Sequence, residues 1–171
     1  MKHLSYPKIP QFRNVIKAIC HASSFVGMDE NGNPVFNESL PKPILEFTGT
    51  VKLHGTNAAV CYNATDGIFY QSRKNLITSK KDNAGFAFFA ENNKDVFEDI
   101  FTHLIHVGNI TPNSTISIYG EWAGGNIQKN VGLQNLPKSF YIFGICITDG
   151  EELYWLSDED MLDLPVNNSK L

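Results

Sequence analysis

A lysine followed at once by a glycine-containing polar turn is the arrangement in this sequence best suited to chemistry. Lys52 ends an apolar run and begins the segment Lys52-Leu53-His54-Gly55-Thr56-Asn57. A lysine amine is a covalent nucleophile when it is unprotonated, and partial burial or a neighbouring cation favours that form. Gly55 and His54 would let backbone and imidazole approach a phosphate closely. Taken alone, the segment fits a solvated lysine before an ordinary turn better.

Three further motifs follow along the chain. They are centred on Arg73, Glu121 and Phe143, and read Gln71-Ser72-Arg73-Lys74-Asn75, Tyr119-Gly120-Glu121-Trp122-Ala123-Gly124-Gly125-Asn126-Ile127-Gln128-Lys129-Asn130-Val131 and Phe140-Tyr141-Ile142-Phe143-Gly144-Ile145. In this order and at these distances, the four motifs resemble the nucleotidyltransferase domain of the RNA ligase 2 family, the ATP-dependent polynucleotide ligases. The resemblance extends over roughly residues 44 to 160.

The resemblance implies a nucleotide site. Lys52 would become covalently adenylylated, and Glu121 would accept hydrogen bonds from ribose hydroxyls. The guanidinium group of Arg73 can form two hydrogen bonds at once with phosphate or ribose oxygens. An aromatic ring such as that of Phe143 can stack on adenine. Gln128 and Lys74 are expected near the nucleotide or the nucleic-acid ends. The expected nucleotide-binding residues are Val51, Lys52, His54, Gly55, Asn57, Arg73, Glu121 and Phe143. The remaining histidines show no metal-ligand spacing.

Each of these residues also has a structural interpretation. Arg73 fits a surface cation, Glu121 an edge-strand charge, and Phe143 the core of a buried strand. Gln128 fits a solvated polar residue. Strand alternation would put residues 140, 142 and 144 on one face and residues 141, 143 and 145 on the other, so only one of the two phenylalanines could face a pocket.

Two departures from the family concern the choice of base. Gly144 stands where the family commonly has an aspartate, and Val51 stands where the residue before the lysine is often a glutamate. The family's later glutamate-glycine and lysine-x-lysine motifs, which complete the phosphate and Mg²⁺ site, are not found in these 171 residues. We therefore expect either a piece of a longer ligase or a remnant that has lost turnover.

Composition indicates a globular chain. Its 171 residues are enough for a sizeable core, and 42% of them are hydrophobic. No stretch has membrane-spanning length, and the N-terminus lacks a signal-peptide core. The three cysteines form no paired framework, and Cys61 and Cys146 are expected as buried, reduced thiols. The cytoplasm is the expected location, or a host cytoplasm if the gene belongs to a phage.

Charge is unevenly distributed, although the net value is −4. Residues 1 to 28 carry four basic residues and no acid, and Arg73, Lys74, Lys80 and Lys81 form a second basic cluster. Acids collect between Asp149 and Asp163 instead. Such a division permits phosphate contacts on one face, and it also fits ordinary solvated surfaces.

The periodicity of apolar residues predicts an α+β fold with mainly antiparallel sheets and flanking helices. We expect one partial nucleotidyltransferase domain over residues 1–171. A loop is expected at Asn31–Pro34, and helices are expected at 10–20, within 83–107 and from Ser157. The expected strands are 44–53, 57–63, 67–72, 114–121, 139–148 and 152–156.

The leading hypothesis is an ATP-dependent RNA ligase. By resemblance, Lys52 would attack the α-phosphorus of ATP, and AMP would pass to an RNA 5′-phosphate. A 3′-hydroxyl would then seal the RNA ends, as in repair of a break or of a nicked duplex. Mg²⁺ would offset the phosphate charge. The alternative is a non-catalytic nucleotide- or RNA-binding remnant, or a relative of the DNA ligase or capping type.

Overall fold

The computed structural model describes residues 1–49, 51–108 and 110–165. The chain divides into two compact units, one of Pro7–Val51 and the other of Met1–Tyr6 together with Lys52–Leu171. We call these the small unit and the sheet unit and describe each by itself. A single domain over residues 1–171 stays a prediction.

The small unit contains one helix and one hairpin. The predicted helix at 10–20 is present as α1 (Phe12–Ser23), which begins just after Pro10. Strands β1 (Phe25–Met28) and β2 (Pro34–Phe36) pair antiparallel. Residues 31–33 of the loop predicted at residues 31–34 lie in their turn, and Pro34 already belongs to β2. In this turn Asp29 Oδ1 accepts the N–H groups of Asn31 and Asn33, each at 2.8 Å. The two strands were missed because they are too short to show an alternating pattern.

The strand predicted at residues 44–53 is wrong. Its described residues have no strand structure, Thr50 lies outside them, and the first strand of the sheet unit begins only at Thr56. Within the run, Ile44 is 98% exposed and Val51 is 86% exposed. A strand needs a neighbour to satisfy its backbone. The strand that follows this run already has a partner on each of its two edges.

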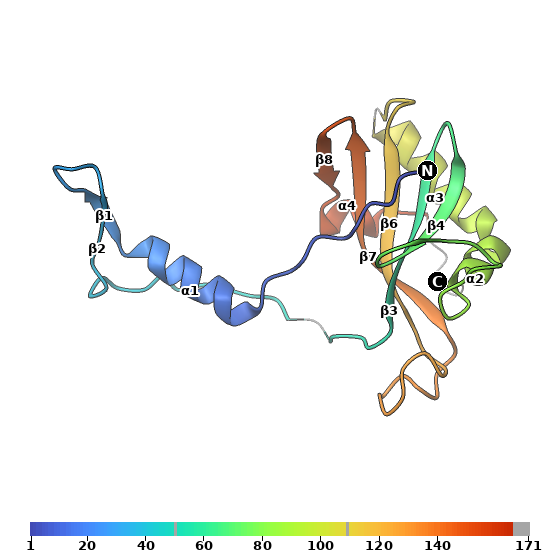
Figure 1. Cartoon of the computed structure of the whole chain (residues 1–171), viewed down its shortest axis with the longest axis horizontal. Helices are drawn as coiled ribbons and strands as arrows, with labels where there is room; N and C mark the ends of the chain where they lie inside the picture. The colour runs from blue at the N-terminus through green and yellow to red at the C-terminus, as the bar shows by residue number, and fades with distance from the viewer. Residues whose placement is uncertain (50, 109, 166–171) are drawn as a thin grey trace. The chain divides into compact units, whose positions relative to one another are not determined.

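The sheet unit is built on one six-stranded sheet, and every neighbouring pair in it is antiparallel. The order across the sheet is β5-β4-β3-β6-β7-β8 (Figure 1). The predicted α+β class with antiparallel sheets is confirmed. The strands are β3 (Thr56–Asn63), β4 (Gly67–Ser72), β5 (Leu76–Ile77), β6 (Thr115–Ala123), β7 (Ser139–Asp149) and β8 (Glu152–Trp155).

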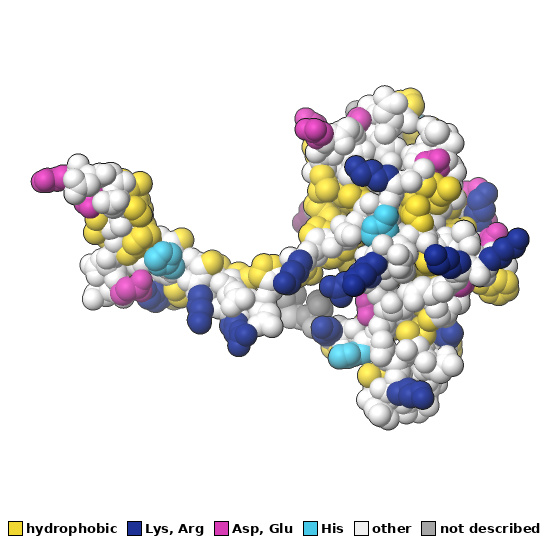
Figure 2. Space-filling model, viewed as in Figure 1, with side chains coloured by type: hydrophobic (Ala, Val, Ile, Leu, Met, Phe, Trp, Pro, Cys, Tyr) yellow, Lys and Arg dark blue, Asp and Glu magenta, His cyan; other side chains and the backbone are white. Residues whose placement is uncertain are grey.

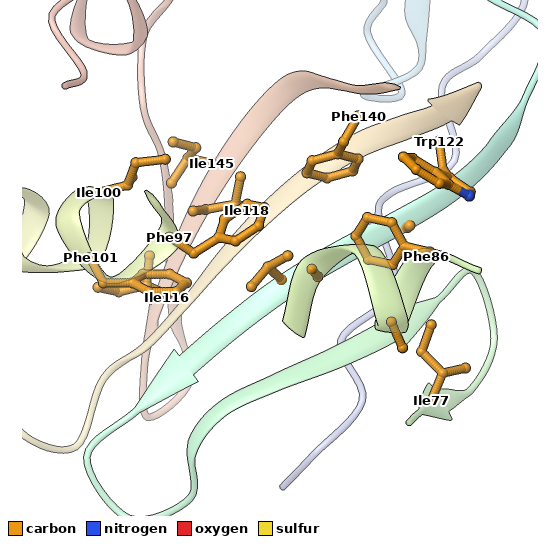
Figure 3. Packing of buried hydrophobic residues seen from close by; sticks show 14 of the residues in the cluster. Ile77, Phe86, Phe97, Ile100, Phe101, Ile116, Ile118, Trp122, Phe140 and Ile145 are labelled. Carbon is orange, nitrogen blue, oxygen red and sulfur yellow. The ribbon is translucent and has the colours of Figure 1, made fainter. Parts of the chain in front are cut away.

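Two helices cover one face of this sheet, as predicted within residues 83–107. They are α2 (Phe86–Asn92) and α3 (Lys94–Val107). The buried residues of α3 recur at helical spacing and pack with those of β3, β6 and β7 (Figure 3). Residues buried in this helix-side core include Val60, Phe86, Phe97, Ile100, Phe101, Leu104, Ile116, Ile118, Trp122, Phe140 and Ile145.

The opposite face of the sheet has a second, smaller core, which we call the open-face cluster. Its buried members are Ala59, Cys61, Phe69, Tyr119 and Cys146. Both cysteines are buried, as predicted, and neither forms a disulfide with a described residue. Burial disfavours the thiolate and raises the pKa of Cys61 to about 12 and that of Cys146 to about 11.

A β-bulge interrupts the pairing of β6 with β7. Tyr119 lies opposite Gly144 and Gly120 lies opposite Ile142, so Phe143 is an extra residue without a partner. The predicted alternation through residues 140–145 is therefore wrong in detail. Ile145 shares the helix-side core with Phe140. Because of the extra residue, odd-numbered residues after the bulge lie on the side of the sheet that even-numbered residues occupy before it.

The C-terminal part of the described chain agrees with the sequence pattern. Gly150, at φ +63°, turns β7 into β8. A helix then starts at the predicted place as α4 (Asp158–Leu162), with Ser157 and Asp160 forming a capping box. Among the helices that the structure describes, none combines the length and apolar character needed to cross a membrane.

Candidate functional site

Strand register brings three of the candidate motifs to one end of the sheet. Asn57 on β3 lies opposite Glu121 on β6. Ser72, the last residue of β4, lies opposite Ala58, so Arg73 immediately follows the same end of the sheet. Residues that are 16 to 64 positions apart in sequence therefore become neighbours, and this is what a site built from separate motifs requires.

Asn57, Glu121 and Phe143 lie on the face of the sheet opposite α2 and α3. Ala59 and Tyr119 belong to the open-face cluster, and side chains two residues apart on a strand point to the same side. Phe143 contacts Tyr6, which packs against the same cluster. Phe143 is 39% exposed, whereas Phe140, on the helix side, is 1% exposed. Phe143 is therefore the phenylalanine that is available to a ligand.

The turn after Lys52 is fixed by residues from the Glu121 motif. The backbone N–H of Gly55 donates to Glu121 Oε1 at 2.9 Å. The side-chain amide of Gln128 donates to the Gly55 carbonyl at 3.0 Å. Gln128 is thus more than a solvated polar residue, because it holds the Lys52 turn against the end of β6.

Gly55 is required at its position by packing. A Cβ atom built there would lie 2.2 Å from the carbonyl oxygen of Trp122 and 2.7 Å from Ala123 Cβ. Neither neighbour is the flexible end of a long side chain, so they cannot easily move away. Glycine lets the Lys52 turn contact β6 directly, which is a different role from the predicted close approach to a phosphate.

A second set of contacts supports the same end of the sheet and was missed in the sequence. Asn83 Nδ2 donates to Thr56 Oγ1 at 3.1 Å. The Ala84 carbonyl accepts from both Trp122 Nε1 at 3.1 Å and Lys138 Nζ at 3.0 Å. These bonds join residues 27 to 54 positions apart, and no local pattern signals them.

The charged candidates lie on the surface. Lys52, His54, Arg73 and Lys74 are exposed, so the partial burial considered for Lys52 is not observed. Neither Lys52 nor Arg73 forms an ion pair with any residue in the described part of the chain. Their cationic groups are therefore available to a ligand. Val51 belongs to the small unit, and the structure does not place it relative to this site.

Arg73 lies in the tight turn between β4 and β5. The Ser72 N–H donates to the Asn75 carbonyl at 2.8 Å, and the Asn75 N–H donates to Ser72 Oγ at 3.3 Å. His3 Nε2 lies 3.0 Å from the Ser72 carbonyl oxygen, which attaches the N-terminal segment to this turn. Figure 2 shows several Lys and Arg side chains exposed on the sheet unit.

Together these groups suit an anionic ligand with a planar base. The exposed amine of Lys52 and guanidinium group of Arg73 lie in segments that flank one end of the sheet, and the carboxylate of Glu121 and the exposed ring of Phe143 lie on the face of the open-face cluster. Arginine and lysine suit phosphates, and aromatic rings suit bases. In residues 1–49, 51–108 and 110–165, no group of three or more His, Cys, Asp or Glu side chains is placed to hold a metal ion.

We expect Glu121→Ala to lower the free energy of unfolding by about 1–2 kcal/mol, because the Gly55 N–H loses its acceptor. Glu121→Gln keeps an acceptor oxygen and should lose less than half as much. Urea unfolding would measure both changes, with Glu91→Ala on the exposed surface of α2 as the control. Equal losses for Ala and Gln would show that the bond to Gly55 does not stabilise the fold.

Comparison with known proteins identifies a family for this chain. A protein-family model described as RNA ligase matches residues 45–168, which is most of the chain. The match includes the Lys52 turn and the motifs of Arg73, Glu121 and Phe143. No curated protein matches the chain. The resemblance identified from the sequence motifs is confirmed at the level of the RNA ligase family.

Proposed function

The chain belongs to the RNA ligase family, and we propose that it transfers AMP from ATP to RNA ends through a covalent bond to Lys52. One observation carries the proposal. Gly55 forms hydrogen bonds with both Glu121 and Gln128. The turn that contains Lys52 is therefore attached to the motif that contains the Glu121 carboxylate. Phe143 is exposed on the same face.

The first step would be attack of the unprotonated Lys52 Nζ on the α-phosphorus of ATP. A nitrogen–phosphorus bond forms, the bond from the α-phosphorus to the bridging oxygen breaks, and pyrophosphate leaves. The amine gives its proton to solvent. Arg73 and His54 would stabilise the charge on the phosphate oxygens, and Glu121 would accept from the ribose.

The later steps would return Lys52 to its free form. A 5′-phosphate oxygen of RNA attacks the phosphorus of the bound AMP, and the nitrogen–phosphorus bond breaks. A 3′-hydroxyl then attacks the activated 5′-phosphate, so that a phosphodiester bond forms and AMP leaves. The chain would hold the ends in line, and positioning of this kind is a major source of rate enhancement.

Mg²⁺ would accompany the triphosphate in this proposal and offset its charge. The donor set of the described residues does not by itself form a Mg²⁺ cage. The ion would therefore be held largely by phosphate oxygens.

The basic cluster beside the site suits an RNA backbone. Arg73, Lys74, Lys80 and Lys81 are all exposed, and they lie in or next to the β4–β5 hairpin. Contacts between such cations and phosphates release counterions, so RNA binding should weaken steeply with salt. These residues favour a nucleic-acid end, either free or in a nicked duplex, as the group that receives AMP.

Intact-mass analysis after incubation with ATP and Mg²⁺ tests the proposal. We expect an added AMP on the protein, removed by subsequent incubation with 5′-phosphorylated RNA. Nucleotide binding without any adduct would favour the alternative, a non-catalytic binding protein. No binding and no adduct would reject both functions.

Phe143→Ala should weaken binding of adenine nucleotide by about 1–3 kcal/mol if the ring stacks on the base. Phe140→Ala should lower the free energy of unfolding by about 3–5 kcal/mol, because its ring is buried between Phe86 and Phe97, without a matching loss of affinity in the folded fraction. Isothermal titration and urea unfolding of both variants separate the two effects. If the losses of affinity simply followed the losses in the free energy of unfolding, Phe143 would not belong to the nucleotide site.

A further inference from the structure

The N-terminal hexapeptide, Met1–Tyr6, crosses the open face of the sheet (Figure 1). The Leu4 N–H donates to Gln71 Oε1 at 3.1 Å, and Gln71 Nε2 donates back to the Leu4 carbonyl. That carbonyl also accepts from the Tyr119 hydroxyl at 2.8 Å. Gln71 and Tyr119 are buried, so these bonds satisfy polar groups that would otherwise be costly. The hexapeptide is therefore an integral layer of the sheet unit.

Tyr6 occupies the centre of an aromatic group at the end of this segment. Its ring centroid lies 4.9 Å from that of Phe143, 5.2 Å from that of Tyr119 and 5.1 Å from that of Trp155. All three pairs are edge-to-face, which is a favoured geometry for aromatic rings. Tyr6 thus links the buried Tyr119 to the exposed Phe143.

Gly144 makes room for this arrangement. A Cβ at Gly144 would lie 3.4 Å from both Tyr6 Cε2 and Trp155 Cζ3. A larger or charged side chain there would meet two aromatic rings. The glycine lets the rings close over the backbone directly beside the bulge.

Phe143 needs such support because of its place in the fold. As the extra residue of the bulge it has no cross-strand partner, and it is 39% exposed. Within the described part of the chain, Tyr6 is the one aromatic ring in contact with Phe143. The orientation of the Phe143 ring therefore depends on a residue from the far N-terminal end of the sheet unit.

We propose that Tyr6 is a positioning residue of the nucleotide site, which fixes the Phe143 ring for stacking on the base. This inference rests on the proposed nucleotide function. Tyr6 acts through Phe143, and the hexapeptide that carries it is held by Leu4 and by the contact between His3 and Ser72. The hexapeptide is then part of the wall of the site and leaves the place of the base free.

Titration of the full chain with ATP provides the test. Tyr6→Ala should weaken binding by about 3- to 10-fold. Tyr6→Phe should keep the affinity of the wild type, because it retains the ring that contacts Phe143. The matched control is Tyr62→Ala, which removes a half-buried ring that stacks on Phe101 on the helix side. It should leave affinity unchanged at a similar cost in stability.

A double variant distinguishes positioning from a general loss of stability. In the Phe143→Ala background, Tyr6→Ala should have little further effect on affinity, because the ring that it positions is gone. Additive losses would overturn the proposal, and so would an unchanged affinity of Tyr6→Ala. Tighter binding by Tyr6→Ala would also overturn it, by showing that Tyr6 stands where the base belongs.

If Tyr6→Ala does not fold, Tyr6→Leu keeps apolar bulk without a ring and carries the same expectations. If wild-type protein binds no ATP, the proposed function fails, and the inference fails with it. ATP binding that is sensitive to Phe143→Ala and insensitive to Tyr6→Ala would retain the proposed function and reject only the role of Tyr6.

Discussion

Lys52→Ala should abolish formation of the covalent AMP adduct. The adduct requires a nitrogen nucleophile at this position, and alanine provides none. Lys52 is exposed and forms no ion pair with the described residues, so the fold should be retained. We expect no detectable adduct by intact mass, with nucleotide affinity reduced by less than about tenfold, since the phosphates lose only one cation.

The control is Lys94→Ala, which removes an exposed lysine of the sheet unit on α3, outside the basic cluster. It should form the adduct as the wild type does. An adduct that persists in Lys52→Ala would place the nucleophile at another residue, and peptide mapping would locate it. Arginine at position 52 keeps the charge without a reactive amine, so Lys52→Arg should bind nucleotide and remain unmodified.

Gly55→Ala should have the second largest effect, because the site has no space for a methyl group. The added Cβ would lie 2.2 Å from the Trp122 carbonyl oxygen. The turn must then move away from β6, which weakens the hydrogen bonds of Gly55 to Glu121 and Gln128. We expect a loss of about 1–3 kcal/mol in the free energy of unfolding. We also expect adduct formation to slow by about 10- to 100-fold.

Gly132→Ala is the matched control, since a Cβ built at Gly132 meets nothing within 4 Å. It should change neither stability nor adduct formation. Urea unfolding and the rate of adduct formation should be measured on the same preparations. A Gly55→Ala variant that matches the wild type in both measurements would show that the turn is not held against β6 in solution.

Local patterns in the sequence determined much of this protein. The turn glycines at positions 67 and 150 both adopt positive φ, and the hairpins predicted around them are present. The apolar residues of 83–107 recur at helical spacing and form α2 and α3. The order of the Lys52, Arg73, Glu121 and Phe143 motifs sufficed to identify the RNA ligase family. Each of these signals is either local, within a few neighbouring residues, or is the order of the motifs along the chain.

Only the tertiary structure decided which pairings form. The apolar run at 44–53 reads as a strand, yet β4 and β6 occupy both edges of β3. The bulge at Phe143 depends on the register between β6 and β7, which no pattern within β7 specifies. The packing of Tyr6 on Phe143 joins residues 137 positions apart. Competition for strand edges and long-range packing depend on the whole sheet. The candidate residues were therefore identified from the sequence, whereas their contacts with one another are set by the tertiary fold.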